Sequence, residues 1–105
     1  MMDIRAYMEA ETGIPTAEVA FTHPQKLPFI AILDRTEEDG DDYHTRIVEH
    51  DLTVEFYAAR IDRRNEDRIE AAFKKSGWKA VKERAWIDRE KMFETIYSIE
   101  FVEKR

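Results

Sequence analysis

The densest group of side chains able to do chemistry lies between Asp34 and Asp42. Closely spaced carboxylates are typical of calcium loops, which also need Gly at the sixth position and an acidic ligand at the twelfth. With Gly40 at the sixth position, the first and twelfth are Arg35 and Arg46, which cannot ligate a cation. We therefore expect a solvated acidic hairpin loop, because six carboxylates cannot be buried without counter-charges. These six are Asp34, Glu37, Glu38, Asp39, Asp41 and Asp42.

The three histidines, His23, His44 and His50, are the other candidate metal ligands. His44 and His50 are six residues apart, too far for one strand to present both to a single ion. His50 shares one face of a predicted strand with the apolar residues Val48 and Leu52. We therefore expect a histidine at the edge of the core with its hydrogen bonds satisfied. The chain has no cysteine, which excludes a disulfide framework, a cysteine-based zinc site and a thiol nucleophile. We expect no metal site and no cofactor.

Carboxylates also alternate along one segment, at Glu49, Asp51 and Glu55. A general acid–base pair needs desolvation or two distinct environments to separate the pKa values of its members. The alternation instead predicts an open polar face of a strand. The sequence contains no nucleophile elbow, Ser/His/Asp signature or glycine-rich phosphate loop, so we expect no enzymatic activity.

Basic residues gather in one later segment, where they could contact phosphate. Asp62, Glu66 and Asp67 are interleaved with them, which is typical of an ordinary solvated helix of mixed charge. The whole chain has 17 basic and 23 acidic side chains, a net charge of −6. This balance argues against a protein held on nucleic acid or on an anionic membrane by bulk electrostatics. The basic residues are Arg60, Arg63, Arg64 and Arg68.

The elements that must position these side chains follow from hydrophobic periodicity. Of the 105 residues, 43% are hydrophobic and 11% aromatic, which predicts one compact domain over residues 1–105. The predicted elements are a helix over 3–12, strands over 17–21, 27–33 and 43–57, a helix from 62 to 77, and strands over 78–87 and 92–102. The predicted fold class is α+β, in the order α-β-β-β-α-β-β. We expect an antiparallel or mixed sheet of four to five strands with both helices packed on one face.

Local signals support these boundaries. Asp3 and Asp62 can cap the two helices, and Gly13 and Gly77 can end them. Along 43–57 the apolar positions alternate with charged ones, which predicts one buried face. The five apolar residues that follow Pro28 indicate a strand covered on both faces, near the middle of the sheet.

Other expectations concern the edges of the sheet and the location of the protein. Val19 and Phe21 should face the same way on the strand over 17–21. The strands over 78–87 and 92–102 are candidates for exposed edges that extend a sheet across subunits. No run of apolar residues reaches the length of a membrane span, and no secretory signal is visible. We therefore expect a cytoplasmic site of synthesis and assembly.

The predicted segments, taken in their order along the chain, resemble a family of small siphophage and prophage tail proteins. The likeness rests on residues 27–33, the acidic segment after them, 52–57, the helix opened by Asp62 with Glu66 to Glu70, and 86–101. It covers nearly the whole chain, and its motifs are structural patterns. The chain departs from the family at residues 58–59, where two alanines replace a usual polar residue, and at Trp78, where the family tends to have an aliphatic residue.

The resemblance implies a tail-completion or tail-terminator protein encoded among the head–tail joining genes. Such a protein forms a ring, expected to be a hexamer, that caps the finished tail tube and contributes to head–tail joining. Its partners would be copies of itself, the tail tube protein and the head–tail connector protein, within the virion. The resemblance implies no enzyme activity, no cofactor, no membrane contact and no specific binding to nucleic acid, although DNA passes through the ring.

Within this hypothesis, the acidic segment contacts a neighbouring subunit, the tube or the lumen. Carboxylates that line a lumen would repel phosphates and let DNA slide. The alternative function is a small regulatory or ligand-binding α+β module, whose open sheet face meets a polar ligand through Glu49, Asp51 and Glu55. The residues assigned to the interaction segment are Glu37, Glu38, Asp39, Asp41 and Asp42.

Overall fold

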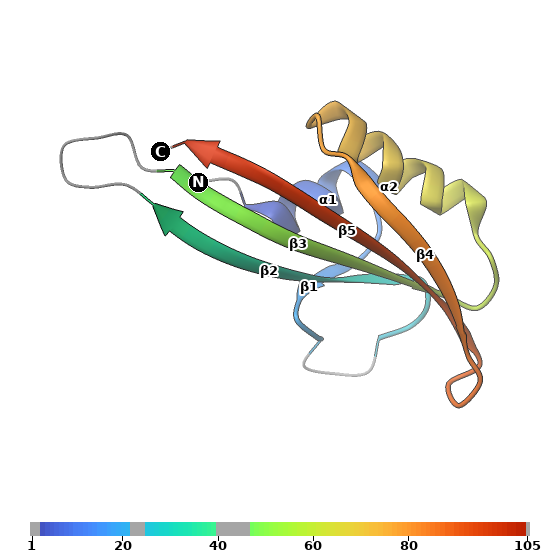
Figure 1. Cartoon of the computed structure of the whole chain (residues 1–105). Helices are drawn as coiled ribbons and strands as arrows, with labels where there is room; N and C mark the ends of the chain where they lie inside the picture. The colour runs from blue at the N-terminus through green and yellow to red at the C-terminus, as the bar shows by residue number, and fades with distance from the viewer. Residues whose placement is uncertain (1–2, 22–24, 40–46, 105) are drawn as a thin grey trace.

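The computed structural model describes residues 3–21, 25–39 and 47–104. It is an α+β fold with a five-stranded mixed sheet in the order β1-β2-β3-β5-β4, and both helices lie on the same face of this sheet (Figure 1). The element order α-β-β-β-α-β-β is the predicted one. The elements are α1 (Ile4–Thr12), β1 (Thr16–Glu18), β2 (Phe29–Asp39), β3 (Ile47–Ala58), α2 (Arg63–Lys75), β4 (Ala80–Ile87) and β5 (Met92–Lys104).

Both helices begin at the predicted caps. The carboxylate of Asp3 accepts a hydrogen bond from the backbone N–H of Ala6, and Asp62 does the same for Asn65, which satisfies donors that have no partner within the helix. Gly13 ends α1 with φ 73°, a left-handed conformation that glycine adopts without steric cost. None of the described helices is both long and apolar enough to cross a membrane.

The core lies between the two helices and one face of the sheet. β3 is its centre, because every second residue from Val48 to Ala58 is buried, as the alternation predicted. α1 contributes Ile4 and Met8, and α2 contributes an apolar stripe that includes Ile69 and Phe73. Burial of this apolar surface is the main favourable contribution to folding.

β2 is longer than predicted and includes most of the segment expected to be an acidic loop. It pairs with β3 continuously from Phe29 opposite Tyr57 to Asp39 opposite Ile47. The loop prediction is therefore wrong for residues 34–39, which are strand. Polar residues carry no hydrophobic alternation, so pairing with β3 decides their conformation against their low strand propensity. Residues 40–42 of the predicted loop lie outside the described part of the chain.

β1 is shorter than predicted and runs parallel to β2. It ends at Glu18, and Val19 follows with φ 65° and 68% of its surface exposed. The expectation that Val19 and Phe21 share one strand face is therefore wrong. The left-handed residue turns the chain away from the sheet after the N–H of Val19 donates to the carbonyl of Ile32.

The edges of the sheet differ in part from those expected. β4 is an edge strand, as predicted, but β5 lies between β3 and β4. The predicted edge position of the C-terminal strand is therefore wrong, because β4 pairs with it as the second arm of a hairpin. β2 lies second in the sheet and is covered on both faces only at its start, since Ala31 is buried while Leu33 is 40% exposed.

Candidate interaction surfaces of the sheet

The face of the sheet opposite the helices, which we call the open face, collects carboxylates from three adjacent strands. The pairing of β2 with β3 sets Glu37 opposite Glu49, and the pairing of β3 with β5 sets Asp51 opposite Glu100. All four residues are exposed. Like charges placed directly across a ladder destabilise it, so this arrangement does not serve the stability of the isolated domain.

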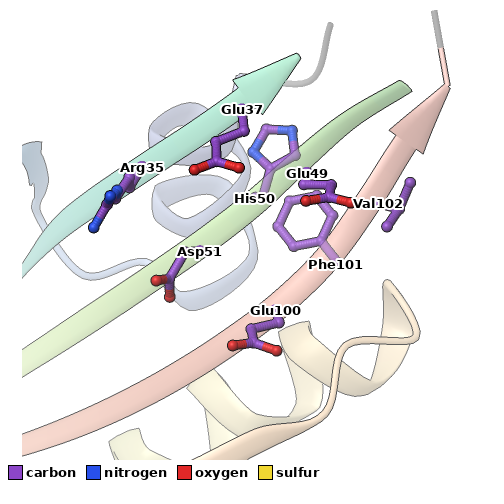
Figure 2. A pocket seen from close by; sticks show the side chains of 8 residues that line it. All are labelled: Arg35, Glu37, Glu49, His50, Asp51, Glu100, Phe101 and Val102. Carbon is purple, nitrogen blue, oxygen red and sulfur yellow. The ribbon is translucent and has the colours of Figure 1, made fainter. Parts of the chain in front are cut away.

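These carboxylates surround a shallow depression of about 440 Å³. Figure 2 shows that Arg35 and Glu37 enter from β2, the neighbouring residues from β3, and Glu100 and Val102 from β5. Arg35, opposite Asp51 in the ladder, supplies the positive charge among the lining residues, which include four carboxylates. A surface of this charge repels the phosphates of nucleic acid. The lining residues are Arg35, Glu37, Glu49, His50, Asp51, Glu100, Phe101 and Val102.

Of the acidic interaction segment, the structure describes the side chains of Glu37 and Glu38. Glu37 lies on the open face of β2 and Glu38 on the other face, because successive side chains of a strand point to opposite faces. Asp41 and Asp42 lie outside the described residues. The structure therefore brings Glu37 together with the predicted open-face residues Glu49 and Asp51. Glu55 lies further along the same face.

Glu55 belongs to a second group on the open face, in which two carboxylates flank one hydroxyl. The hydroxyl of Tyr57 lies 2.7 Å from Glu55 Oε2 and 2.6 Å from Glu94 Oε2. A phenol has a single proton to donate, so one of the two carboxylates gains no hydrogen bond from it. Partial burial, together with the adjacent Glu94 carboxyl, raises the pKa of Glu55. Glu55 therefore keeps its proton to a higher pH than a free glutamate side chain does.

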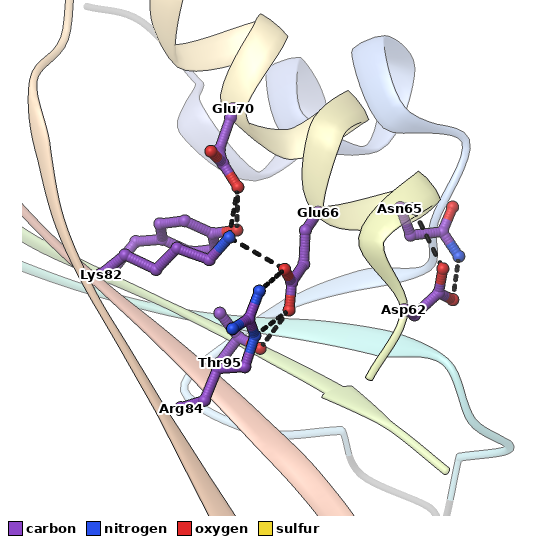
Figure 3. Close-up of polar contacts among 8 residues, drawn as sticks. Asp62, Asn65, Glu66, Glu70, Lys82, Arg84 and Thr95 are labelled. Carbon is purple, nitrogen blue, oxygen red and sulfur yellow. Dashed lines mark hydrogen bonds and ion pairs between the residues drawn. The ribbon is translucent and has the colours of Figure 1, made fainter. Parts of the chain in front are cut away.

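Beneath α2, a different carboxylate is almost completely neutralised. Glu66 is 1% exposed and accepts two bonds from Arg84, at 2.9 and 2.6 Å (Figure 3). Lys82 Nζ lies 2.8 Å from the same carboxylate, and the hydroxyl of Thr95 donates at 2.9 Å. These contacts, those of Arg84 first, lower the pKa of Glu66 to about 2.

The sequence led us to expect Glu66 on the solvated face of its helix, and this expectation is wrong. β4 runs beneath α2 and places Arg84 and Lys82 against the helix (Figure 3). Lys82 also bonds Glu70 at 2.8 Å, and the hydroxyl of Tyr97 donates to Glu70 at 2.9 Å. The cluster therefore fastens α2 to the edge of the sheet and performs a structural role.

His50 lies at the edge of the core, as its alternation with apolar residues predicted. It is 3% exposed, and its ring stacks on Phe101 with centroids 4.2 Å apart. Its Nδ1 lies 2.9 Å from Asp34, while Nε2 faces Glu103 at 3.6 Å, which is beyond hydrogen-bond distance. The expectation that its hydrogen bonds are satisfied is therefore confirmed for Nδ1 and wrong for Nε2. Asp34 was not predicted as its partner, because the acidic sequence around Asp34 predicted a loop.

The other predicted candidates remain apart. Within residues 3–21, 25–39 and 47–104, no three His, Asp or Glu side chains are grouped as metal ligands would be. His23 and His44 lie outside these ranges. The basic residues Arg63, Arg64 and Arg68 are exposed on α2, as expected for a helix of mixed charge.

Comparison with known proteins supports the fold assignment. No protein-family model matches the sequence, and no curated protein matches it. Among solved structures, a chain of the virion of a native gene transfer agent particle has a similar fold, with a TM-score of 0.58. The two share 10% sequence identity, and the match covers 93% of this chain and 84% of that chain. At this identity the likeness establishes a shared fold.

Proposed function

We propose that this protein is a structural component of a phage or phage-like particle, and specifically a tail-terminator or tail-completion protein. The observation that carries the proposal is the fold, which is shared over 93% of the chain with a component of a gene transfer agent virion. The resemblance of residues 27–33, 52–57 and 86–101 to tail-completion proteins supports the same assignment.

In this role the protein forms a ring, a hexamer in our proposal, on the end of the tail tube. Its partners are further copies of itself, the tube protein and the head–tail connector protein, and its place is the head–tail junction of the virion. The helix face of the sheet is occupied by the core, which leaves the open face and the sheet edges for partners. The chemistry required is recognition and exclusion, with no catalytic step.

The open face suits a channel through which DNA passes. Glu37, Glu49, Asp51 and Glu100 would present negative charge to the phosphates, so DNA would move through the ring without adhering. We propose that the open face lines the lumen and that the two helices lie on the outside of the ring. This extends the expected role of the acidic segment from residues 37–42 to the whole face.

The experiment that tests the function is binding to purified tail tubes of the same phage or prophage. We expect the protein to bind at tube ends in negative-stain images and to stop further addition of tube subunits. A matched pair of variants carries the same change of charge. E49Q alters the open face, and E90Q alters the β4–β5 turn, which lies away from the depression.

Tubes that keep growing in the presence of the protein would contradict the proposal. The depression of about 440 Å³ favours the alternative of a ligand-binding module. That alternative predicts a persistent monomer that binds a small polar ligand saturably and loses it in E49Q.

A further inference from the structure

We propose that copies of this chain join head to tail through their sheet edges. β4 of one copy pairs antiparallel with the outer half of β2, residues 33–38, of the next copy. This inference rests on the proposed function, because it names the surfaces that would form the ring. It is argued from the two edges of the sheet, their backbone groups and their charges.

The first step concerns the edge formed by β2. β1 covers only Ile30–Ile32 of this strand, and beyond Ile32 the described part of the chain places no strand beside it (Figure 1). The N–H of Ile30 and the carbonyl of Ile32 point toward this edge, since they bond Pro15 and Val19. Alternation along a strand directs the N–H and C=O groups of Asp34 and Thr36 the same way.

The second step concerns the opposite edge, which is formed by β4. Along each strand, residues whose N–H and C=O groups bond one neighbouring strand alternate with residues whose groups face the other side. Followed from β2 through β3 and β5, this alternation directs the N–H and C=O groups of the even-numbered residues of β4 outward. The side chains of Lys82 and Arg84 lie on the helix face, where they meet Glu66. The side chains of Asp34 and Thr36 lie on the helix face of β2. On both edges, the even-numbered residues direct their N–H and C=O groups outward and their side chains to the helix face. The two edges can therefore form a continuous ladder with the helices of both copies on the same side.

Charge selects the pairing. An antiparallel ladder between residues 80–85 and 33–38 sets Arg84 opposite Asp34 on the helix face, and Glu83 opposite Arg35 on the open face. No like charges oppose each other in this alignment, and opposite pairs stabilise a ladder. Sliding β4 by two residues along β2 in one direction sets Glu83 opposite Glu37, and like charges directly opposite each other destabilise a ladder.

Pairing of like edges is disfavoured by the same rule. Two copies of β4 in antiparallel alignment set Glu83 opposite Glu83 with Lys82 opposite Arg84, or Arg84 opposite Arg84. Charged residues on an edge strand commonly prevent such self-pairing. β4 therefore disfavours pairing with a second β4 and favours pairing with β2, which gives a heterologous interface that closes into a ring when the rotation permits.

The ladder ends at Ala85 opposite Leu33, because β1 covers Ile30–Ile32 of the next copy and β4 must leave this edge from Trp86 onward. Within that length the stagger is compatible with closure. Within one sheet Ala80 lies level with Asp34, through Ile99 and Leu52. In the proposed ladder Ala80 lies opposite Glu38 of the next copy, a stagger of four residues, or about 13 Å at 3.3 Å per residue. Four strands at about 4.8 Å separate successive copies by about 19 Å. The resulting strand tilt of about 34° is close to the tilt of closed β-barrels.

The direction of this tilt also places the two faces. Viewed from the open face with β2 pointing up, β2, β3 and β5 follow one another from left to right (Figure 2), and β4 lies beyond β5. With this order the stagger coils the strands in a right-handed sense, as the twist of strands favours, when the helices face outward. The open face with its carboxylates then lines the lumen.

The test is disulfide cross-linking in a chain that has no cysteine of its own. The double variant R35C/E83C places thiols at directly opposed positions of a non-hydrogen-bonded pair, about 4.5 Å apart between Cα atoms, which a disulfide can bridge. In a single chain these positions lie on opposite edges of the sheet, so any bond between them joins two copies. R35C/V81C is the matched control, two residues out of alignment.

We expect R35C/E83C to give, under mild oxidation, a reducible series of covalent multimers that ends at the ring size, and R35C/V81C to give at least fivefold less. Charge reversal provides a second measurement. R35E or E83R alone should weaken self-association about two- to fivefold per interface, and R35E/E83R should restore it.

Equal cross-linking by the two cysteine variants would overturn the inference, as would rings that form without any cross-link in R35C/E83C. The second outcome leaves the proposed function standing, since rings would then form through other surfaces. Wild-type chains that neither associate at millimolar concentration nor bind tail tubes would overturn the inference and the proposed function together.

Discussion

The two faces of one sheet treat their carboxylates in opposite ways. On the helix face, Glu66 is buried and bonded by Arg84, Lys82 and Thr95, and its pKa falls to about 2. On the open face, Glu55 shares one hydroxyl with Glu94, and its pKa is raised. The helix face therefore uses a buried carboxylate to hold the fold, whereas the carboxylates around the depression on the open face are exposed.

The largest effect should come from breaking the apolar part of the helix face. Phe56 is 1% exposed at the centre of the core, so F56A should lower the free energy of unfolding by about 3–5 kcal/mol. Phe101 is only half-buried and stacks on His50 and Trp78, so F101A should cost less, about 1–2 kcal/mol. Urea denaturation followed by circular dichroism measures both, and unchanged unfolding of F56A would contradict the assigned core.

The next effect should come from the neutralised carboxylate. E66Q removes the charge that three side chains bond, and it should destabilise the domain by about 2–3 kcal/mol at pH 7. Because the pKa of Glu66 is about 2 in the folded state, against about 4.5 when unfolded, its contribution is complete above pH 5. The contribution of Glu66 to stability is lost as the pH falls from about 5 to about 2.

The wild type should therefore lose stability between pH 5 and pH 2 more steeply than E66Q. Thermal melting across this range measures the difference. E70Q is the control, because Glu70 is partly exposed and bonds Lys82 and Tyr97 without being buried. Equal pH dependence in the wild type and E66Q would contradict the account of the helix face.

The open face should respond with the opposite sign. The raised pKa of Glu55 means that the folded state prefers the protonated group, so stability is lost as the pH rises through that pKa. E94Q removes the neighbouring charge and should stabilise the domain by about 0.5 kcal/mol at pH 8. Thermal melting at pH 5 and pH 8 measures this. A loss of stability in E94Q at pH 8 would show that the pair holds the fold together.

The smallest effect on stability should come from the carboxylates around the depression. E49Q and E100Q should change the free energy of unfolding by less than about 0.5 kcal/mol, since both residues are exposed. In the assembled ring the same variants should retain DNA more strongly, because fewer charges repel the phosphates. Filter binding at fixed salt tests this, and unchanged retention would separate the open face from the DNA path.

The parts of the fold that local signals encode could be predicted from the sequence. Asp3, Gly13 and Asp62 mark helix ends through bonds and conformations that involve only near neighbours. The alternation along β3 reports its buried face in the same way. The outer half of β2 has no such signal, since residues 34–39 are polar on both faces and only the pairing with β3 keeps them extended.

The site residues show the same limit. Glu49 and Asp51 were assigned to an open face because their own strand alternates. Glu94 meets Glu55 only through the alignment of β3 with β5, and Glu66 meets Arg84 only because β4 lies beneath α2. Contacts between residues far apart in the sequence depend on the alignment of strands, which composition and periodicity do not specify.

The central claim, that the helix face holds the fold while the open face serves the assembly, is tested most directly by electron cryomicroscopy of the ring on the end of a tail tube. We predict that Glu49, Asp51 and Glu100 face the lumen, with α1 and α2 on the outer surface. A ring in which these carboxylates face the outside solvent, away from the channel and from every subunit contact, would contradict the account.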